Sequence, residues 1–244
     1  MFALRNQAFE AAKEQRQAIT AQAEQLIERL NQFAAQTLAQ LNSAKADVEA
    51  IKAEFATLDL PKEAKGLYNK FNASISAIAT KRDSARSQAE EQSWTDLFTV
   101  LNALREYEVA VVAQTASESL AVQKTNLETL IANTPRWPTG CFSQVQQRLA
   151  KVDAITSAIQ TSNTELLHTL TIRAEILAGQ DSPAEDKQAR MAYQVKQMQQ
   201  AFGLRDSSFE PLVLEWIALG GVATPAYTTL LSRFNGARAH GVKS

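Results

Sequence analysis

Apolar residues in the N-terminal part of the chain follow the spacing of a coiled-coil seam. Neither Gly nor Pro occurs from Phe2 to about Leu58, and apolar residues recur there in alternating steps of 4 and 3. Two consecutive steps of 4 around Thr37 form a stutter, which locally relaxes a supercoil. The pattern predicts one long helix that needs a partner helix, either within the chain or in a second copy. The seam consists of Ile19, Ala23, Leu26, Leu30, Phe33, Thr37, Leu41, Ala44, Val48, Ile51, Phe55 and Leu58.

A proline-containing break and further helical stripes follow. Pro61 disfavours helical geometry at the residue before it, so Asp59-Leu60-Pro61 should end the first helix. A second helix is predicted from Lys62 to about Glu91, packing antiparallel on the end of the first through Leu67, Phe71, Ile75 and Ile78. Ser93, followed by Asp96, is an N-cap signal for a third helix that carries Leu97, Leu101, Leu104 and Val111. A fourth helix is predicted from Glu118 to Ala132.

Residues 133–140, Asn-Thr-Pro-Arg-Trp-Pro-Thr-Gly, form the clearest break in the chain. We therefore expect three regions: a long helical hairpin region with one degenerate repeat at 1–132, a Pro-rich corner at 133–140, and a C-terminal helical region at 141–244. In the last region, Phe142 to Ala178 is predicted as one helix or as two in line. Two shorter helices should follow, from Phe209 to Leu219 and, with Thr224 as N-cap, from Pro225 to about Ala239.

A helical hairpin is predicted over residues 166–203. Its first arm has an apolar stripe of Leu166, Leu170, Ala174 and Leu177, and Gly179 is placed to end the arm in the left-handed conformation. Ser182, Pro183 and Glu185 have the order of an N-cap, a first helical residue and a capping box. The second arm carries the stripe Met191, Val195, Met198 and Phe202, which we expect to pack on the first arm.

Composition supports an all-α fold of long antiparallel helical hairpins, a coiled-coil-like bundle with short Pro-containing corners. Only 8 Gly and 6 Pro occur, while Ala, Gln, Leu and Glu are abundant. The net charge of -1 gives no strong field toward nucleic acid or an acidic membrane. No apolar run approaches the length of a membrane span and the N-terminus lacks a signal-peptide core, so a cytoplasmic protein without membrane contact is expected.

The residues that carry most protein chemistry are sparse. Cys141 is the single cysteine, which excludes an intrachain disulfide, and His168 and His240 lie far apart in the sequence. No His, Cys or carboxylate spacing indicates a metal site, and no sequence context indicates a nucleophile or a phosphate-binding loop. We therefore expect a non-enzymatic protein with no catalytic residues, no metal and no cofactor.

Two segments of the chain resemble each other. Glu54-Phe55 precedes Leu67-Tyr68-Asn69-Lys70-Phe71, and Glu215-Trp216 precedes Leu230-Leu231-Ser232-Arg233-Phe234. Each pattern predicts a corner between two helices, in which the aromatic residue of one arm packs on the Phe of the other. These residues resemble the bacterial domain-of-unknown-function 349 helical repeat family, and Arg173 to Leu177 with Ser182 to Arg190 is similar to the C-terminal region of its long proteobacterial members. The resemblance implies a helical cytoplasmic protein, here a fragment or a shortened member, and it supplies no established activity.

Three groups of residues are candidates for contact with partners. The first is an interaction patch on the hairpin, where cross-arm ion pairs of Arg173 and an i, i+4 pair of Asp186 with Arg190 should fix the register. The second is a set of corner residues, among which Trp137 either plugs the corner or stacks on a base. The third is a set of basic residues for nucleic acid. The groups are Arg173, Glu175, Asp186, Arg190 and Tyr193; Arg136, Trp137, Trp216 and Phe234; and Lys81, Arg82, Arg86, Arg233 and Arg238.

These observations predict a helical interaction or scaffold module that acts through helix faces. Its protein partner is not identified by the sequence, and self-association through the first helix is one alternative. A nucleic-acid-binding or ribosome-associated factor that uses the local Lys/Arg clusters is the rival hypothesis, and the small net charge counts against it.

Overall fold

The structure is a computed structural model that describes residues 2–199, 208–222 and 225–241. Every regular element in these ranges is a helix, and no strand occurs in them, which confirms the all-α prediction. The chain divides into two compact units, Met1–Glu90 and Glu91–Ser244, each of which is described separately below. The division falls inside one helix, α4 (Lys65–Val112). The Pro-containing corner at 133–140 instead lies within the second unit.

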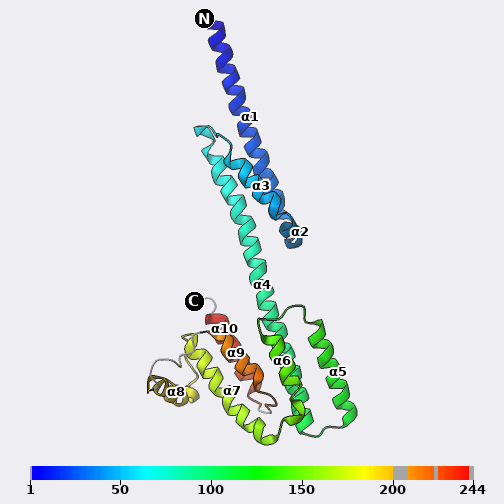
Figure 1. The fold of residues 1–244 in the computed structure, drawn as a ribbon. Coiled ribbons are helices and arrows are strands. Elements are labelled where there is room, and N and C mark those ends of the chain that lie inside the picture. Colours follow the sequence, from blue (N-terminus) through cyan, green and yellow to red (C-terminus); the bar gives the residue numbers. More distant parts are fainter. Residues whose placement is uncertain (1, 200–207, 223–224, 242–244) are drawn as a thin grey trace. The chain divides into compact units, whose positions relative to one another are not determined.

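The first unit contains α1 (Phe2–Ala35), α2 (Leu38–Ser43), α3 (Lys45–Ala56), a short 3₁₀ turn η1 (Lys62–Ala64) and the first part of α4. The prediction of one helix from Phe2 to Leu58 is wrong, because the chain breaks after Ala35 and α3 returns along α1 (Figure 1). Thr37 begins α2 with a capping box, in which its backbone N–H donates to Gln40 Oε1 at 3.0 Å. The break coincides with the stutter of the seam.

The core of the first unit is formed by the predicted seam, folded back on itself. Residues of α1, α2, α3 and α4 make one buried cluster: Ala23, Leu26, Ile27, Leu30, Leu41, Val48, Ile51, Phe55, Leu67 and Ile78. The ring of Phe55 stacks on Phe71 of α4 with 3.8 Å between centroids. The partner that the seam of α1 requires between Ala23 and Leu30 is therefore supplied by the same chain.

The second unit begins in the middle of α4. The predicted helix start at Ser93 is wrong: Ser93 is buried within α4, and Asp96 accepts a hydrogen bond from Gln92 Nε2 at 2.8 Å. No Gly or Pro interrupts the chain there, so the helix continues. The remaining elements are α5 (Ser117–Asn133), α6 (Cys141–Leu149), η2 (Val152–Ala154), α7 (Ser157–Leu177), η3 (Ala184–Asp186), α8 (Lys187–Gln199), α9 (Phe209–Ala218) and α10 (Tyr227–Gly241).

The segment from Phe142 to Ala178, predicted as one helix or as two in line, forms two helices, α6 and α7. A short 3₁₀ turn separates α6 from α7, and Thr156 is the N-cap of α7, with its Oγ1 accepting from the backbone N–H of Ile159 at 3.3 Å. The predicted N-cap Thr224 lies outside the described residues. Helix α7 packs on both α9 and α10, and α6 packs on α9.

The core of the second unit explains why residues 133–140 are not a boundary between compact units. Its buried cluster includes Leu97, Leu101 and Leu104 of α4 together with residues from both sides of the corner, Ile131 of α5 and Cys141 of α6. Trp137 in the corner is half-buried and packs against this cluster. The corner is therefore a tight turn across a continuous core.

An ion pair is buried in this core. Arg148 of α6 and Glu108 of α4 form a bidentate pair with Nε–Oε1 and Nη2–Oε2 distances of 2.7 Å, and their side chains are 3% and 0% exposed. Burial alone would lower the pKa of Arg148, but the hydrogen bonds and charge of Glu108 outweigh it and the pKa is raised. The guanidinium of Arg148 is thus held in its charged form.

The same carboxylate holds the turn after α9. Glu108 Oε2 accepts from the backbone N–H of Gly221 at 2.5 Å, and Arg148 Nη1 donates to the carbonyl of Ile217 at 3.1 Å. Gly221 has φ +70°, and a Cβ there would lie 2.5 Å from Ile155 Cγ2, so glycine is required. The pair therefore joins α4, α6 and the end of α9.

Leu30→Ala should lower the free energy of unfolding by about 2–5 kcal/mol, because it leaves a cavity in the first core. Urea unfolding at several protein concentrations measures this, with the exposed Gln25→Ala as the control. We expect the unfolding midpoint of the wild type to be independent of concentration. A midpoint that rises with concentration would show that the seam pairs between chains.

Arg148→Met should lower the free energy of unfolding by about 3–5 kcal/mol, because it leaves the Glu108 carboxylate buried without its counter-charge. The double variant Glu108→Leu/Arg148→Met should recover part of this loss. Denaturant unfolding of the two single variants and the double variant measures the coupling. If the losses in free energy of unfolding of the two single variants simply added in the double variant, the two side chains would not be energetically coupled.

Candidate functional site

An ion-pair network joins α7, η3 and α10 beside the start of α8. Glu175 of α7 is buried and accepts two hydrogen bonds from Arg233 of α10, Nε to Oε1 at 2.8 Å and Nη2 to Oε2 at 3.0 Å. Ser182 Oγ donates to Glu175 Oε2 at 2.6 Å. Asp186, at the end of η3, is 2.7 Å from Arg233 Nη2 through Oδ2 and 2.7 Å from His168 Nε2 through Oδ1. Arg233 therefore bridges two acids from different elements.

The charges of this network set the ionisation of Asp186. Burial by itself would raise the pKa of Asp186, but hydrogen bonds and charges from Arg233 and His168 outweigh burial and lower the pKa below its ordinary value of 3.8. The carboxylate is consequently ionised at neutral pH, and it holds η3 against α7 and α10.

Arg190 connects the first turn of α8 to the same network. Its Nη1 donates to the carbonyl of Gln180 at 2.6 Å and to Ser182 Oγ at 3.1 Å. The loop between α7 and η3 is therefore fixed from both sides, and Gly179 within it has φ +67° as predicted. We call Glu175, Ser182, Asp186, Arg190, Arg233 and His168 the anchor network.

The structure corrects the predicted pairings around the hairpin. The ion pair of Arg173 that the described residues show is with α9, where its Nη1 lies 2.5 Å from Glu215 Oε2. Arg190 does not pair with Asp186, whose oxygens are taken by His168 and Arg233. Ser182 does not cap a helix, since its hydroxyl donates to the buried Glu175, and Pro183 precedes η3 instead. A buried carboxylate without a hydrogen-bond donor costs more free energy than a solvent-exposed helix start without a cap, because water can bind the N–H groups of the helix start.

Three members of the anchor network, Ser182, His168 and Arg233, lie outside the interaction patch predicted from the sequence. His168 and Glu175 are 7 residues apart, which places them on one face of a helix and was a usable signal. Arg233 comes from the last helix, 58 residues after Glu175. No local spacing indicates that contact.

The second arm of the predicted hairpin does not cover the first. Leu170 and Ala174 of α7 are buried in the core that α9 and α10 complete. On α8, Met191, Val195 and Met198 are 66%, 46% and 77% exposed. The predicted packing of this stripe on the first arm is therefore wrong, and Phe202 lies outside the described residues.

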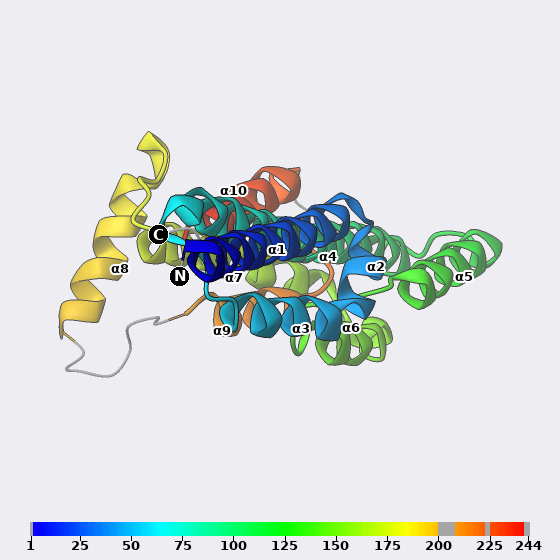
Figure 2. The same ribbon diagram turned by 90° about the horizontal axis from the view of Figure 1, so that it is seen from above.

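Helix α8 lies at the edge of the second unit, beyond the end of α7 (Figures 1 and 2). None of its residues is buried. Tyr193 is half-buried, and its hydroxyl accepts from Gln197 Nε2 at 3.0 Å. We call Met191, Val195 and Met198 the α8 stripe. It is an apolar helix face whose base is held by the anchor network.

The predicted corner residues are mostly core residues. Trp216 and Phe234 are buried, and their ring centroids lie 4.4 Å apart. In the first unit, the ring centroids of Phe55 and Phe71 lie 3.8 Å apart. The predicted packing of aromatic on Phe is thus found at both corners, and Trp216 and Phe234 are not available to a partner. Trp137 packs on Phe142 with 5.4 Å between the ring centroids, while Arg136 is exposed.

Most of the predicted basic residues serve intramolecular contacts. Lys81 Nζ donates to the carbonyls of Ala34 and Gln36 at 2.8 and 2.5 Å, and Arg82 Nη2 donates to that of Leu41 at 2.8 Å, so both satisfy backbone carbonyls around the α1–α2 turn. Arg238 is buried, with its guanidinium 4.1 Å from the Trp94 ring centroid. Only Arg86 of this set is exposed. The five residues therefore form no common basic surface.

Neither a metal-binding cluster nor an ionised thiol is found in the described part of the chain. No group of three or more His, Cys, Asp or Glu that could hold a metal is found in the described ranges. Burial, and the charge of Glu210, raise the pKa of the Cys141 thiol to about 11, so the thiol stays protonated. No helix among the described residues is both long and apolar enough to cross a membrane.

No protein-family model matches the chain, and no curated protein or solved structure matches it either.

Asp186→Asn should lower the free energy of unfolding at neutral pH by about 1.5–3 kcal/mol, because hydrogen bonds of Arg233 and His168 to a charged acceptor are lost. The folded pKa of Asp186 is lowered, so the ionised carboxylate stabilises the fold above its unfolded pKa, and this contribution disappears as the pH falls through the folded pKa. The difference in free energy of unfolding between the variant and the wild type, measured by urea unfolding, should therefore be smaller at about pH 3 than at about pH 7. The exposed Glu185→Gln is the control, and a pH-independent difference would contradict the argument.

Proposed function

We propose that this protein is a non-enzymatic helical interaction or scaffold module that binds a protein partner through a helix face, the α8 stripe. The observation that carries the proposal is the exposure of Met191, Val195 and Met198 on one side of a helix that its own chain leaves uncovered within the described residues. Single exposed apolar residues are common, but a continuous apolar helix face marks a binding surface.

The chemistry of the stripe suits recognition of a protein. Met191, Val195 and Met198 follow the i, i+4, i+7 spacing by which an amphipathic helix presents its contacts. Methionine side chains are flexible and polarizable, and they adapt to apolar partners of different shape. A partner with a complementary apolar groove or helix would remove these side chains from water.

The anchor network supports the same function. Asp186 and Arg190 hold the start of α8 through contacts with Arg233, Gln180 and Ser182. A binding helix that is already ordered loses less conformational entropy on association than a free segment does. The buried charges thus help to present α8.

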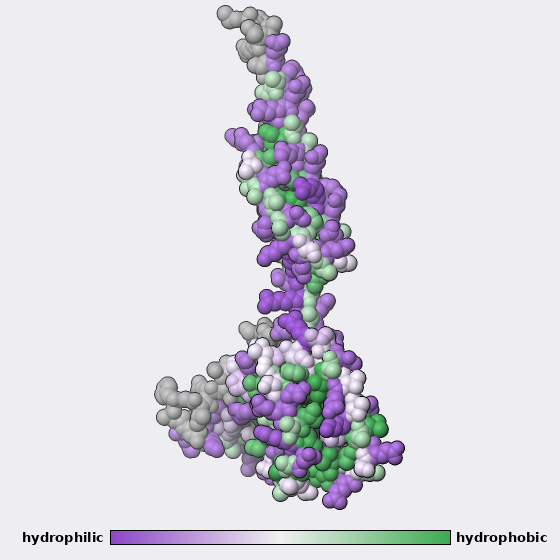
Figure 3. All heavy atoms as spheres, turned by 45° about the vertical axis from the view of Figure 1, so that its right-hand side comes forward, coloured by the Kyte–Doolittle hydropathy of each residue, from purple (hydrophilic) through white to green (hydrophobic). Residues whose placement is uncertain are grey.

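We also propose that the protein is a cytoplasmic member of the domain-of-unknown-function 349 family. The two aromatic corners support a repeat, since Phe55 packs on Phe71 and Trp216 on Phe234. The acid before each first aromatic also faces an arginine, Glu54 with Arg29 at 4.0 Å and Glu215 with Arg173. The surface drawn in Figure 3 is mostly hydrophilic over the first unit, while apolar side chains gather on a face of the second unit.

The double variant Met191→Glu/Met198→Glu should lose its protein partners in affinity capture from bacterial lysate, because two carboxylates would be buried in the interface. Ala189→Glu is the matched control: Ala189 is exposed and lies about 160° around α8 from Met191. Circular dichroism should show equal helicity for all three proteins. Capture is compared by mass spectrometry with and without nuclease.

Partners that survive nuclease and bind the wild type and Ala189→Glu, but not the double variant, are the expected result. Identical capture by all three proteins would remove the α8 stripe as the binding surface. Partners that vanish with nuclease, ribosomal proteins above all, would replace the proposal by the nucleic-acid or ribosome-associated function.

A further inference from the structure

One face of α1 is buried over part of its length and exposed over the rest. Residues at positions 9, 12, 16, 19, 23, 26 and 30 follow one another in alternating steps of 3 and 4 and therefore share a face. Ala23, Leu26 and Leu30 are buried against α3 and α4, and Ile19 is half-buried. Ala12 and Arg16 are exposed, and Phe9 is 69% exposed. The seam of the first unit thus continues beyond the point where its own chain covers it.

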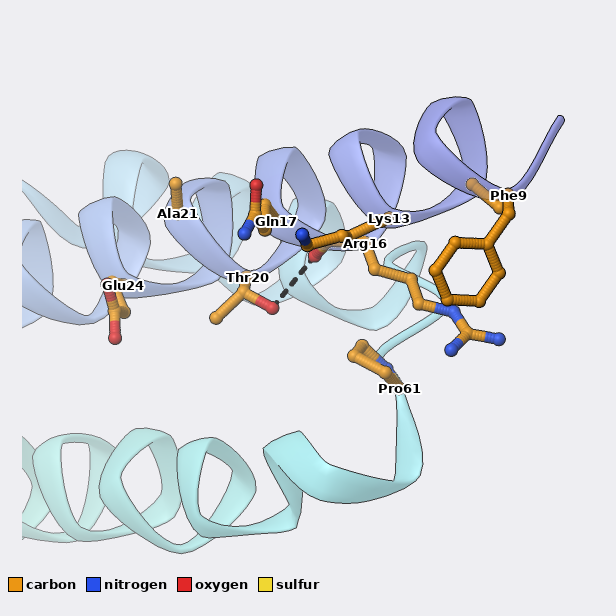
Figure 4. Close-up of a pocket in the computed structure, with 9 residues that line it drawn as sticks. Phe9, Lys13, Arg16, Gln17, Thr20, Ala21, Glu24 and Pro61 are labelled. Atoms are coloured by element: carbon orange, nitrogen blue, oxygen red, sulfur yellow. Dashed lines mark hydrogen bonds between the residues drawn. The ribbon is translucent and has the colours of Figure 1, made fainter. Parts of the chain in front are cut away.

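The exposed part of the seam borders a hollow beside the corner that joins α3 to α4. Among the residues that line it are Phe9, Ala12, Lys13, Arg16, Thr20 and Pro61. Figure 4 shows the Phe9 ring and the Arg16 guanidinium next to each other, with Pro61 on the neighbouring corner. A helix laid along this part of α1 would continue the packing that α3 and α4 provide further along. The hollow is therefore continuous with an established helix–helix interface.

Arg16 determines which chemistry fits the hollow. It occupies the seam position 7 residues before Ala23 and 14 before Leu30, where a neutral residue would be expected. Its guanidinium has no ion pair with any residue that the structure describes, whereas the nearby Lys13 lies 3.8 Å from Glu10. A charge at a seam position becomes costly when a partner covers it, unless the partner brings the opposite charge. The occupant should thus carry a carboxylate opposite Arg16.

A second copy of the chain does not meet this requirement. In a parallel pair of α1 helices, Arg16 would face Arg16 of the other copy. In an antiparallel pair with position 9 opposite position 12, Arg16 would face position 5, which is also Arg, and with position 9 opposite position 19 it would face Ala12. None of these arrangements brings a carboxylate opposite Arg16 in the seam.

We propose that the exposed seam of α1, from Phe9 to Ile19, and the corner at Pro61 bind an acidic amphipathic helix of a protein partner. Phe9 and Ala12 contact its apolar stripe, and Arg16 pairs with a carboxylate on it. This surface belongs to the first unit and does not involve the α8 stripe, so either surface can fail its test while the other stands.

Two synthetic amphipathic helices of three heptads test the proposal, both with Leu at the seam positions, one with Glu and one with Lys at the flanking positions. The full chain should bind the Glu peptide at least about tenfold more tightly than the Lys peptide in fluorescence anisotropy. Arg16→Glu should invert this preference, and Phe9→Ala should weaken binding of both peptides. Hydrogen exchange should slow for α1 amides near Phe9 to Thr20 in the complex with the Glu peptide.

Ala18→Glu is the matched control, because Ala18 is exposed and lies about 160° around α1 from Arg16. This control and the α8 variant Met191→Glu/Met198→Glu should both bind the Glu peptide as the wild type does. Equal affinity for the two peptides, no saturable binding of either, or no effect of Arg16→Glu would overturn the proposal. A wild-type dimer in sedimentation equilibrium that Phe9→Asp dissolves would assign the face to a second copy and overturn it as well.

Discussion

The arrangement of α7, η3, α8 and α10 depends on one guanidinium. Arg233 donates to both oxygens of the buried Glu175 and pairs with Asp186, so it neutralises two acids that come from different elements. The planar fork of Arg suits this task, because its N–H groups can reach two carboxylates at once, which the single ammonium of Lys cannot do with the same geometry. Two carboxylates this close would repel each other without it.

A second arginine–carboxylate pair is buried in the core of the second unit. Glu108 and Arg148 are removed from water together, and the same carboxylate accepts the backbone N–H of Gly221. The cost of removing two charges from water is offset only when nearly all their hydrogen-bonding groups are satisfied, and here the backbone supplies the missing partners. Both networks join elements that are distant in the sequence, and in both the charges hold the fold together.

Several residues that suggest binding in the sequence instead stabilise the fold. Side chains that suggest binding in the sequence, such as Trp216, Phe234, Lys81 and Arg82, stabilise corners and helix ends. The α8 stripe and the start of the α1 seam are instead apolar and exposed. The binding surfaces that we propose are therefore helix faces, and the anchor network holds the start of one of them, α8.

The sequence alone determined the fold class, many helix ends and most residues of the first core. Spacing of apolar residues identified the seam around Leu30 and the aromatic corners, since a helix must bury its apolar stripe wherever it finds a partner. Only the tertiary structure decided which surface covers each stripe: α3 returns on α1 at Thr37, α9 and α10 cover α7, and α8 is left exposed. Periodicity records that a face is apolar but not what lies against it. For the same reason, the pairing of Arg233 with Glu175, or of Glu108 with Arg148, follows from contacts between distant elements that no local pattern encodes.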